Sequence, residues 1–317
     1  METGTILVTG ANGQIGTVLT AELRRRYGAS AVLSTDIRQA GSNNILFEEL
    51  DVLDKERLSA LIAKYGIRQI YHLAAILSAK GEQNPKWAWE INMAGLFNIL
   101  EAAKDHGLRV FFPSSIAVFG GMTPRVNTPQ YAVLQPETVY GISKVAGENW
   151  CQYYHQKYGV DVRSVRYPGI IGYESLPGGG TTDYAVEIFH YAVKGETFQC
   201  FLEPDSRLPM MYMPDAIRAT LELMEAPAEA VKIRSSYNLA GTNFTPAEIA
   251  REIQKHIPGF QVTYKPDFRQ QIAASWPESI DDSYAREHWG WEPRYGLAEI
   301  TADMLEHLRE YYAASVS

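Results

Sequence analysis

A tyrosine and a lysine stand four residues apart in the segment ETVYGISKVAGE, at Tyr140 and Lys144. If this segment starts a helix, the two side chains share one helix face. A nearby ammonium group favours the ionised phenol and lowers its pKa from about 10, which a tyrosine requires to act as a base near neutral pH. The same spacing also occurs on exposed helix faces. The pair therefore indicates proton transfer only in combination with other signals.

A glycine-rich turn, TGANGQIG, is the second pattern that could carry chemistry. Gly10, Gly13 and Gly16 would let the backbone turn tightly before a helix, whose unpaired amide groups attract a pyrophosphate. An ordinary tight turn would use glycines in the same way. Asp36, however, ends the next apolar run, where a carboxylate would accept hydrogen bonds from an adenine-ribose diol. Together these features predict dinucleotide binding, and the carboxylate favours NAD over NADP, although Arg38 would suit a 2′-phosphate.

The framework that would position these residues alternates strands and helices. Apolar runs typical of strands occupy 5–10, 31–36, 69–75, 109–115 and 161–169, and helical periodicity occupies 17–28, 55–66, 85–107 and 143–159. This alternation predicts an α/β fold with a doubly wound parallel sheet, right-handed crossovers and helices on both faces. Ligands of such sheets bind at the carboxyl ends of the strands.

The alternating rhythm breaks after Gly169. The glycine-rich segment LPGGGTTDY and scattered prolines follow, but no flexible Gly/Ser linker separates the two parts. We therefore expect residues 1–169 to form most of a dinucleotide-binding domain. Residues 170–317 would form mainly a smaller substrate-binding lobe, with some segments returning to the first sheet.

Composition excludes several classes of protein. The 317 residues carry a net charge of -8, which argues against nucleic acid or an anionic membrane as a partner. The basic run Arg24 to Arg26 falls where the first helix should end, and there it would complement the helix dipole. The two cysteines, Cys151 and Cys200, have no metal-ligand spacing, so neither a metal site nor a disulfide framework is expected. No signal peptide or membrane span is recognisable, which predicts a cytoplasmic protein.

Four motifs in combination resemble the extended short-chain dehydrogenase/reductase superfamily. They are the glycine turn, the HLAA strand end at 72–75, Ser115 at the end of another predicted strand, and Y-x-x-x-K. In that superfamily the tyrosine exchanges the substrate hydroxyl proton, the lysine lowers the tyrosine pKa and holds the nicotinamide ribose, and the serine steadies the hydroxyl. The resemblance covers essentially the whole chain and implies that Tyr140, Lys144 and Ser115 are catalytic. It implies a Rossmann fold and NAD contacts at further positions, namely Gln14, Ile15, Asp51, Leu73, Ala74, Ala75, Asn92, Tyr167 and Ile170.

Two branches of this superfamily fit less well. Dehydratases place an acidic pair after the catalytic hydroxyl residue, whereas Ile116 and Ala117 follow Ser115 here. Nucleotide-sugar epimerases commonly carry R-[YF]-F-N, and this chain has RYPG at 166–169. A nucleotide-sugar 4-epimerase is weakened as an alternative but not excluded. The intact catalytic set argues against a third alternative, a non-catalytic NAD-binding regulator.

Three longer segments resemble the short-chain-type NAD-dependent L-threonine 3-dehydrogenases. They are PSSIAVFG, RYPGIIGYESLPGGGTTDYAVEIFHYA and SWPESIDDSYAREHWGW. The resemblance implies oxidation of the L-threonine 3-hydroxyl to 2-amino-3-oxobutanoate, and a homodimer built through the helix at 85–107 and the helix after Tyr140. It places on the substrate side, beside Ser115 and Tyr140, the residues Ser78, Gly180, Thr182 and Trp276. Trp276 could instead only cover the core, and His72 is expected to be a core residue.

Overall fold

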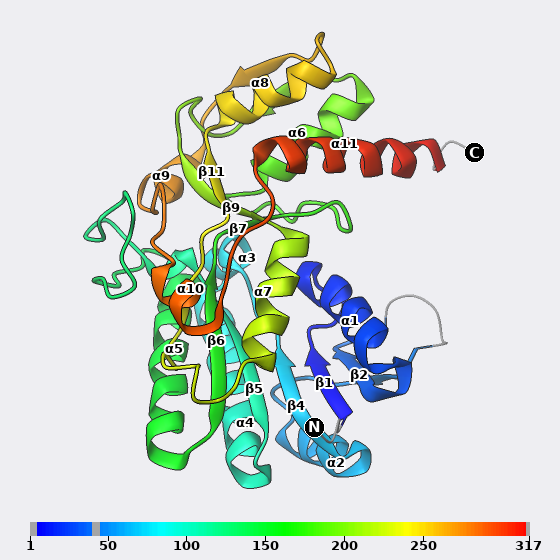
Figure 1. Cartoon of the computed structure of the whole chain (residues 1–317), viewed down its shortest axis with the longest axis vertical. Helices are drawn as coiled ribbons and strands as arrows, with labels where there is room; N and C mark the ends of the chain where they lie inside the picture. Colours follow the sequence, from blue (N-terminus) through cyan, green and yellow to red (C-terminus); the bar gives the residue numbers. More distant parts are fainter. Residues whose placement is uncertain (1–4, 40–44, 315–317) are drawn as a thin grey trace.

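A seven-stranded parallel sheet forms the centre of the computed structural model, which describes residues 5–39 and 45–314 (Figure 1). The strand order is β10-β6-β5-β4-β1-β2-β3, and every neighbouring pair is parallel. The predicted doubly wound sheet is therefore confirmed, with the order reversing between β1 and β4. The strands are β1 (Thr5–Thr9), β2 (Val32–Asp36), β3 (Phe47–Glu49), β4 (Ile67–His72), β5 (Arg109–Ser115), β6 (Asp161–Tyr167) and β10 (Tyr237–Asn238).

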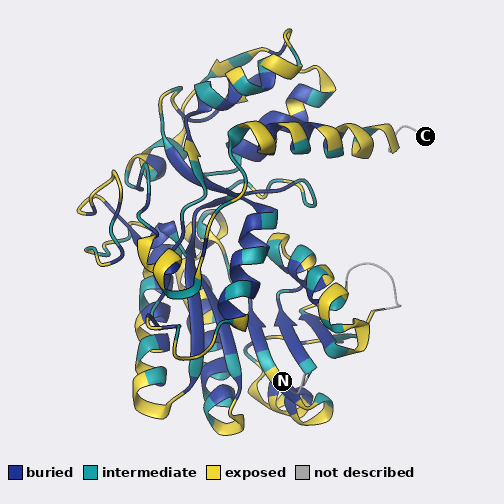
Figure 2. Ribbon diagram, in the orientation of Figure 1, coloured by how far each residue is buried: buried dark blue, intermediate teal, exposed yellow. Residues whose placement is uncertain are grey.

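Apolar side chains on both faces of the strands explain why helices cover both sides of the sheet. In β1, Leu7 packs in one core cluster with three helices, whereas Ile6 and Val8 pack in another on the opposite face. The first cluster includes α2 (Lys55–Tyr65), α4 (Pro85–His106) and α5 (Val139–Tyr158), and the second α1 (Gln14–Tyr27), α7 (Met213–Glu225) and α10 (Ser283–Trp289). Figure 2 shows the resulting pattern of buried strands between helices with exposed outer faces.

Residues at the helix ends set where the helices begin and stop. Asn84 caps α4 through its side chain, and Thr138 does the same for α5. Both helices end at glycines in the left-handed conformation, Gly107 and Gly159. Periodicity predicted the start of α5 at 143, but the Thr138 cap starts it at Val139. Tyr140 consequently lies in the first helical turn.

The C-terminal half builds a second core above the sheet (Figure 1). It holds a three-stranded sheet in the order β11-β9-β7 and a two-stranded sheet of β12 and β8. Its elements are β7 (Gly169–Ile171), α6 (Tyr184–Lys194), β8 (Phe198–Cys200), β9 (Leu208–Tyr212), β11 (Thr242–Phe244), α8 (Pro246–His256), β12 (Val262–Tyr264), α9 (Phe268–Ala274) and α11 (Leu297–Ala314). Because α7, β10 and α10 pack on the first sheet, the chain crosses between the two parts more than once.

Several short elements were not predicted from periodicity. They are β3, the helix α3 (Ser78–Gln83) and the 3-10 helices η1 (Ala29–Ala31) and η2 (Ile116–Val118). Each is too short to show a periodic pattern of apolar residues. Within residues 5–39 and 45–314, no helix has the length and apolar character needed to cross a membrane.

Candidate active site

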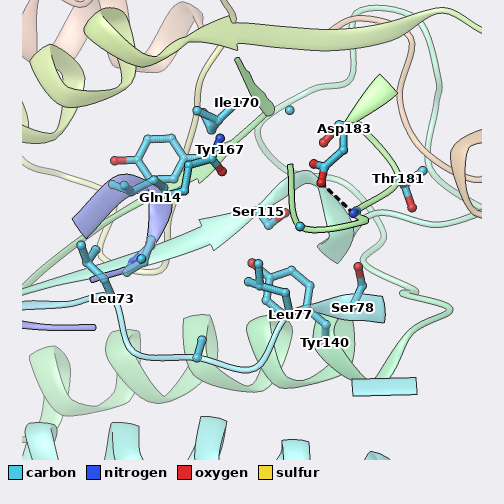
Figure 3. A pocket seen from close by; sticks show the side chains of 18 of the residues that line it. Gln14, Leu73, Leu77, Ser78, Ser115, Tyr140, Tyr167, Ile170, Thr181 and Asp183 are labelled. Atoms are coloured by element: carbon cyan, nitrogen blue, oxygen red, sulfur yellow. Dashed lines mark hydrogen bonds between the residues drawn. The ribbon is translucent and has the colours of Figure 1, made fainter. Parts of the chain in front are cut away.

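A cavity of about 610 Å³ lies at the carboxyl ends of the sheet strands and joins the glycine turn to Tyr140 and Lys144. Figure 3 shows Ser115 between Tyr140 and the loop that carries Thr181 and Asp183, with Tyr167 and Gln14 on another side. The cavity thus brings together residues from distant parts of the chain. The sequence-predicted residues that line it are Gly10, Gly13, Gln14, Ile15, Gly16, Leu73, Ala75, Ser78, Ser115, Tyr140, Lys144, Tyr167, Ile170, Gly180, Thr182 and Trp276.

The geometry of the glycine turn fits a dinucleotide pyrophosphate. Gly10 has φ +68°, and a Cβ atom at Gly16 would lie 2.2 Å from the Gly10 carbonyl oxygen, so neither position accepts a side chain as the turn stands. Gly13 precedes α1, and no side chain caps the helix. The first amide groups of α1 therefore lack a side-chain acceptor at the cavity wall, which suits an anionic ligand.

Asp36, which does not line the cavity, is tied to the glycine turn. Its Oδ2 accepts the Asn12 amide at 3.0 Å and its Oδ1 accepts the Ile37 amide at 2.8 Å. Asn12 also donates through Nδ2 to the carbonyl oxygen of Arg38 at 2.8 Å. Each carboxylate oxygen retains capacity for a further donor, such as a ribose hydroxyl. Asn12, which the sequence analysis missed, is recognisable only from this cross-connection between the turn and β2.

Four further predicted cofactor residues lie outside the cavity lining, namely Asp51, Ala74, Asn92 and the exposed Arg38. Asp51 is exposed, and its Oδ1 accepts the Leu53 amide at 2.9 Å within a turn. Ala74 donates its amide to Thr9 Oγ1 at 3.4 Å. The backbone at Ala74 also borders the glycine turn, because a Cβ atom at Gly10 would lie 2.7 Å from the Ala74 nitrogen.

Asn92 is buried and acts on the cavity through a neighbour. Its Oδ1 accepts the Ile76 amide at 2.7 Å, and its Nδ2 donates to the Ile76 carbonyl at 3.0 Å and to Ser143 Oγ at 3.1 Å. Ile76 lines the cavity, whereas Asn92 does not. Asn92 therefore holds the loop after β4 against α5.

Tyr140 and Lys144 share the inner face of α5, as their spacing predicted. Lys144 Nζ lies 5.4 Å from the Tyr140 ring centroid and donates to the Pro113 carbonyl oxygen at 2.6 Å. Burial lowers the pKa of Lys144 to about 8, against the opposing effects of Cys151 and Glu148.

The expected lowering of the Tyr140 pKa is not found in this structure. Burial raises the pKa of Tyr140 to about 12, and hydrogen bonding to Ser115 opposes that shift. Removal of the phenol from water is the dominant cause, although Lys144 Nζ lies 5.4 Å from the centre of the Tyr140 ring. In this state Tyr140 is neutral at neutral pH.

His72 is a buried core residue, as the sequence indicated. Its side chain is 3% exposed, and its Nδ1 lies 2.9 Å from Thr9 Oγ1. Burial lowers the pKa of His72 to about 3, and the charge of Lys144 acts in the same direction. The ring is therefore neutral at neutral pH.

The proposed substrate side is formed by the loop before α6 and by Trp276. Asp183 Oδ2 accepts the Gly180 amide at 2.9 Å, which closes the loop on itself (Figure 3). Trp276 is 7% exposed and belongs to the second core, and it also lines the cavity. Sequence reasoning missed the lining residues Lys80, Thr181 and Asp183. An aspartate directly before a helix is typical of an N-cap, and this signal could have identified Asp183.

A buried ion pair contacts the end of β5, the strand that carries Ser115. Glu148 and Arg166 are 2% and 4% exposed and form two hydrogen bonds of 2.9 and 2.7 Å. Ser114 Oγ donates to Glu148 at 2.6 Å, and Arg166 reaches Asn238 Oδ1 at 3.0 Å. The pair therefore connects β5, β6, α5 and β10. No group of three metal-ligating side chains occurs among the described residues.

Residues 6–240 match the model of the NAD dependent epimerase/dehydratase family. The mitochondrial L-threonine 3-dehydrogenase of Bos taurus is 48% identical over 304 residues, which covers 95% of this chain and 81% of that protein.

Solved structures of threonine dehydrogenases are also similar to this chain. The holo form of a GalE-like L-threonine dehydrogenase from Cupriavidus necator has a TM-score of 0.95 and 57% identity, covering 96% of this chain and 99% of that one. A monomeric L-threonine 3-dehydrogenase from a metagenome has a TM-score of 0.94 and 46% identity, covering 97% and 99%. A UDP-glucose 4-epimerase from Thermotoga maritima shares the fold at a TM-score of 0.84 with 24% identity, covering 99% and 100%.

Proposed function

Because the chain belongs to the NAD dependent epimerase/dehydratase family, we propose that it oxidises the 3-hydroxyl group of L-threonine to give 2-amino-3-oxobutanoate. NAD, when bound, accepts the hydride that leaves the substrate carbon. The observation that carries this function is one cavity lined by the glycine turn and by Tyr140, Lys144 and Ser115. Full-length similarity to threonine dehydrogenases selects the substrate. The epimerase alternative has support only from a distant relative.

The roles of the catalytic residues follow from their chemistry. Tyr140 takes the proton of the substrate hydroxyl, and Ser115 holds that hydroxyl by a hydrogen bond. Lys144 carries positive charge beside the phenol ring and favours its ionised form once it turns from Pro113. In this assignment the charged neighbour opposes the effect of burial on the phenol.

The cofactor is held at the other end of the cavity. The amide groups at the start of α1 bind the pyrophosphate, and the Asp36 carboxylate binds the adenine ribose. Asp36→Ala should weaken NAD binding by about 1.5–3 kcal/mol, the range for a hydrogen bond to a charged group, and should narrow the preference over NADP. Equal affinity of the unmutated protein for both cofactors, measured by fluorescence titration, would contradict this assignment.

The substrate is held by polar groups from two segments and covered by a third. Ser78, Gly180 and Thr182 bind the carboxylate and ammonium groups of the amino acid, and Trp276 covers it. Support comes from their positions around the cavity beside Ser115. A site built for these charged groups rejects alcohols that lack them, because its own donors and acceptors would then be left unpaired.

The proposal includes the oligomeric state, which is a homodimer. Two chains pair through α4 and α5, whose exposed aromatic and apolar side chains include Trp87, Trp89, Ile142, Trp150 and Tyr153. The metagenomic relative described as monomeric argues in the other direction, and light scattering decides between them. A molar mass of one chain would rule out the dimer.

The division near residue 169 into cofactor and substrate parts remains a proposal, as does the cytoplasmic location, which two free buried thiols support.

The direct test is NADH formation with a panel of substrates. L-Threonine should be oxidised well and L-serine poorly, because serine lacks the methyl group that a small apolar pocket would bury. Simple 2-alkanols should not react, and UDP-galactose should not be converted to UDP-glucose. Turnover of the UDP-sugars without oxidation of threonine would replace this function by the epimerase alternative.

A further inference from the structure

We propose that Gly169 determines substrate specificity, because its bare backbone receives the methyl group of Thr182 and thereby aims the Thr182 hydroxyl at the substrate. This inference rests on the proposed function, since it assigns the same cavity to a small amino acid. It adds a specificity residue on the wall that faces the substrate loop. In the sequence, Gly169 stands where nucleotide-sugar epimerases commonly carry an asparagine.

Gly169 stands where the chain passes from one sheet to the other. It comes two residues after β6 ends at Tyr167 and is the first residue of β7, where it pairs with Met210 of β9. Both Gly169 and Thr182 line the cavity. A change at this position therefore acts on the substrate wall without touching the glycine turn.

No side chain fits at Gly169 while Thr182 keeps its place. A Cβ atom at Gly169 would lie 2.7 Å from Thr182 Cγ2, 2.8 Å from Thr182 Cβ and 2.6 Å from Met210 Sδ, and real Cβ atoms essentially never approach within 3.0 Å. Met210 can move the end of a flexible side chain. Thr182 has a single side-chain torsion beyond its backbone and is stiff there, so its whole residue must shift.

The atoms that face Gly169 identify the orientation of Thr182. The methyl group and Cβ of Thr182, rather than its hydroxyl, are its atoms nearest to a Cβ atom at Gly169. The backbone around Thr182 is held as well, because Asp183 binds the Gly180 amide at 2.9 Å and Thr182 accepts the Ala185 amide at 3.1 Å. Thr182 is therefore held in one position, between Gly169 on one side and the start of α6 on the other.

Two consequences for substrate choice follow from this position of Thr182. The Thr182 hydroxyl is presented as a donor, which suits the carboxylate of a small 3-hydroxy amino acid. The loop also lies directly against β7, which leaves no room beside Gly169 for a larger substituent. Because a side chain at 169 would displace Thr182 and its loop from β7, it should lower the affinity for L-threonine and relax the exclusion of bulkier 3-hydroxy amino acids.

A double-mutant cycle between Gly169→Ala and Thr182→Gly tests this coupling. Gly169→Ala alone should raise KM for L-threonine by about ten- to a hundredfold, as expected for losing one hydrogen bond to a charged group. In the Thr182→Gly background, where the obstructing atoms are gone, the same substitution should leave KM within about twofold. NAD affinity should be unchanged in all variants, and phenylserine should gain relative to threonine in Gly169→Ala.

The control substitution is Gly259→Ala, because a Cβ atom at Gly259 would meet nothing within 4 Å. It should leave KM and the thermal midpoint unchanged. A Gly169→Ala protein with normal KM, or an equal rise of KM in both backgrounds, would overturn the proposal. If Gly169→Ala fails to fold, the double variant should fold, and failure of both would assign the contact to Met210 instead.

The same cycle measured by thermal unfolding separates this proposal from the proposed function. If the unmutated protein does not oxidise threonine, the proposed function fails. The thermal unfolding midpoints still test the contact between Gly169 and Thr182. Gly169→Ala should lower the midpoint less when Thr182 is replaced by glycine. Equal lowering in both backgrounds would refute the contact, whatever the substrate.

Discussion

The reactivity of Tyr140 depends on two opposing effects at a single side chain. Burial raises its pKa, whereas a charged lysine beside it would lower the pKa. In the state described here Lys144 donates to Pro113, and burial dominates. The proposed base is therefore neutral at neutral pH in this state.

Tyr140→Phe should lower kcat by about 100- to 10,000-fold, the usual contribution of a positioned acid or base, with little change in NAD affinity. In the unmutated protein the rate of alcohol oxidation should rise with pH, because only the ionised phenol accepts a proton. Initial rates across a pH series check both expectations. A Phe variant with near-normal kcat would assign the base elsewhere.

His72 should make the protein less stable in acid. Its pKa is about 3 in the folded protein, against 6.5 in the unfolded chain. Because the folded pKa is the lower one, its contribution is complete above 6.5 and is lost as the pH falls toward 3. The loss is about 1.4 kcal/mol per pH unit. His72→Asn keeps a polar group near Thr9 but cannot titrate, so urea unfolding between about pH 6.5 and about pH 5 should show a shallower decline. Parallel declines would exclude His72 as the cause.

At the scale of the elements, the start of α5 places the catalytic face. Thr138 Oγ1 accepts the Gly141 amide at 3.0 Å, and a Cβ atom at Gly141 would lie 2.1 Å from the Ala117 carbonyl oxygen. The first turn of α5 therefore packs directly on the segment after Ser115. A helix that began one turn later would leave Tyr140 without a defined orientation.

Thr138→Ala should cost about 1 kcal/mol of folding stability and should also lower kcat, because it loosens the turn that carries Tyr140. Thr138→Ser, which keeps the oxygen, should restore both. The matched control is Thr245→Ala, which removes the cap of α8. It should cost a similar free energy and leave kcat unchanged. A normal kcat for Thr138→Ala, with the expected loss of stability, would contradict the positioning role.

At the scale of the whole molecule, buried polar contacts tie the cofactor sheet to the second half of the chain. Glu148 of α5 and Arg166 of β6 form the centre of this network, which extends to β10 through Asn238. Asn238 Nδ2 in turn donates to the Asp281 carbonyl at 3.2 Å, five residues from Trp276. The cavity is thereby bounded by parts of the chain that are held in one arrangement.

Arg166→Met should lower the free energy of unfolding by about 3–5 kcal/mol, because it leaves Glu148 buried without its partner. A double variant with methionine at both positions should recover part of the loss. Lys255→Met, which breaks the exposed pair with Glu252, should have a much smaller effect. Urea unfolding measures all three. An Arg166→Met protein as stable as the unmutated one would show that the pair is dispensable.

The features that were predictable from sequence are those encoded by neighbouring residues. The strand pattern around Leu7, the glycine turn at 10–16 and the spacing of Tyr140 and Lys144 follow from repeats of 2 and 3.6 residues and from local backbone geometry. These patterns were enough to predict the parallel sheet and to place the glycine turn and Tyr140 at its carboxyl ends, whereas the substrate-side residues Ser78, Gly180, Thr182 and Trp276 were expected only from family resemblance.

Other properties arise only when distant segments meet. Asn92 reaches Ile76 and Ser143, and Gly169 meets Thr182, through contacts that no local pattern announces. The direction of the Tyr140 pKa shift belongs to the same class, because desolvation depends on every segment that surrounds the phenol. Sequence spacing can bring a lysine to the same helix face as a tyrosine. Which neighbour receives the lysine's hydrogen bond, and how far the phenol is removed from water, are decided by packing in three dimensions.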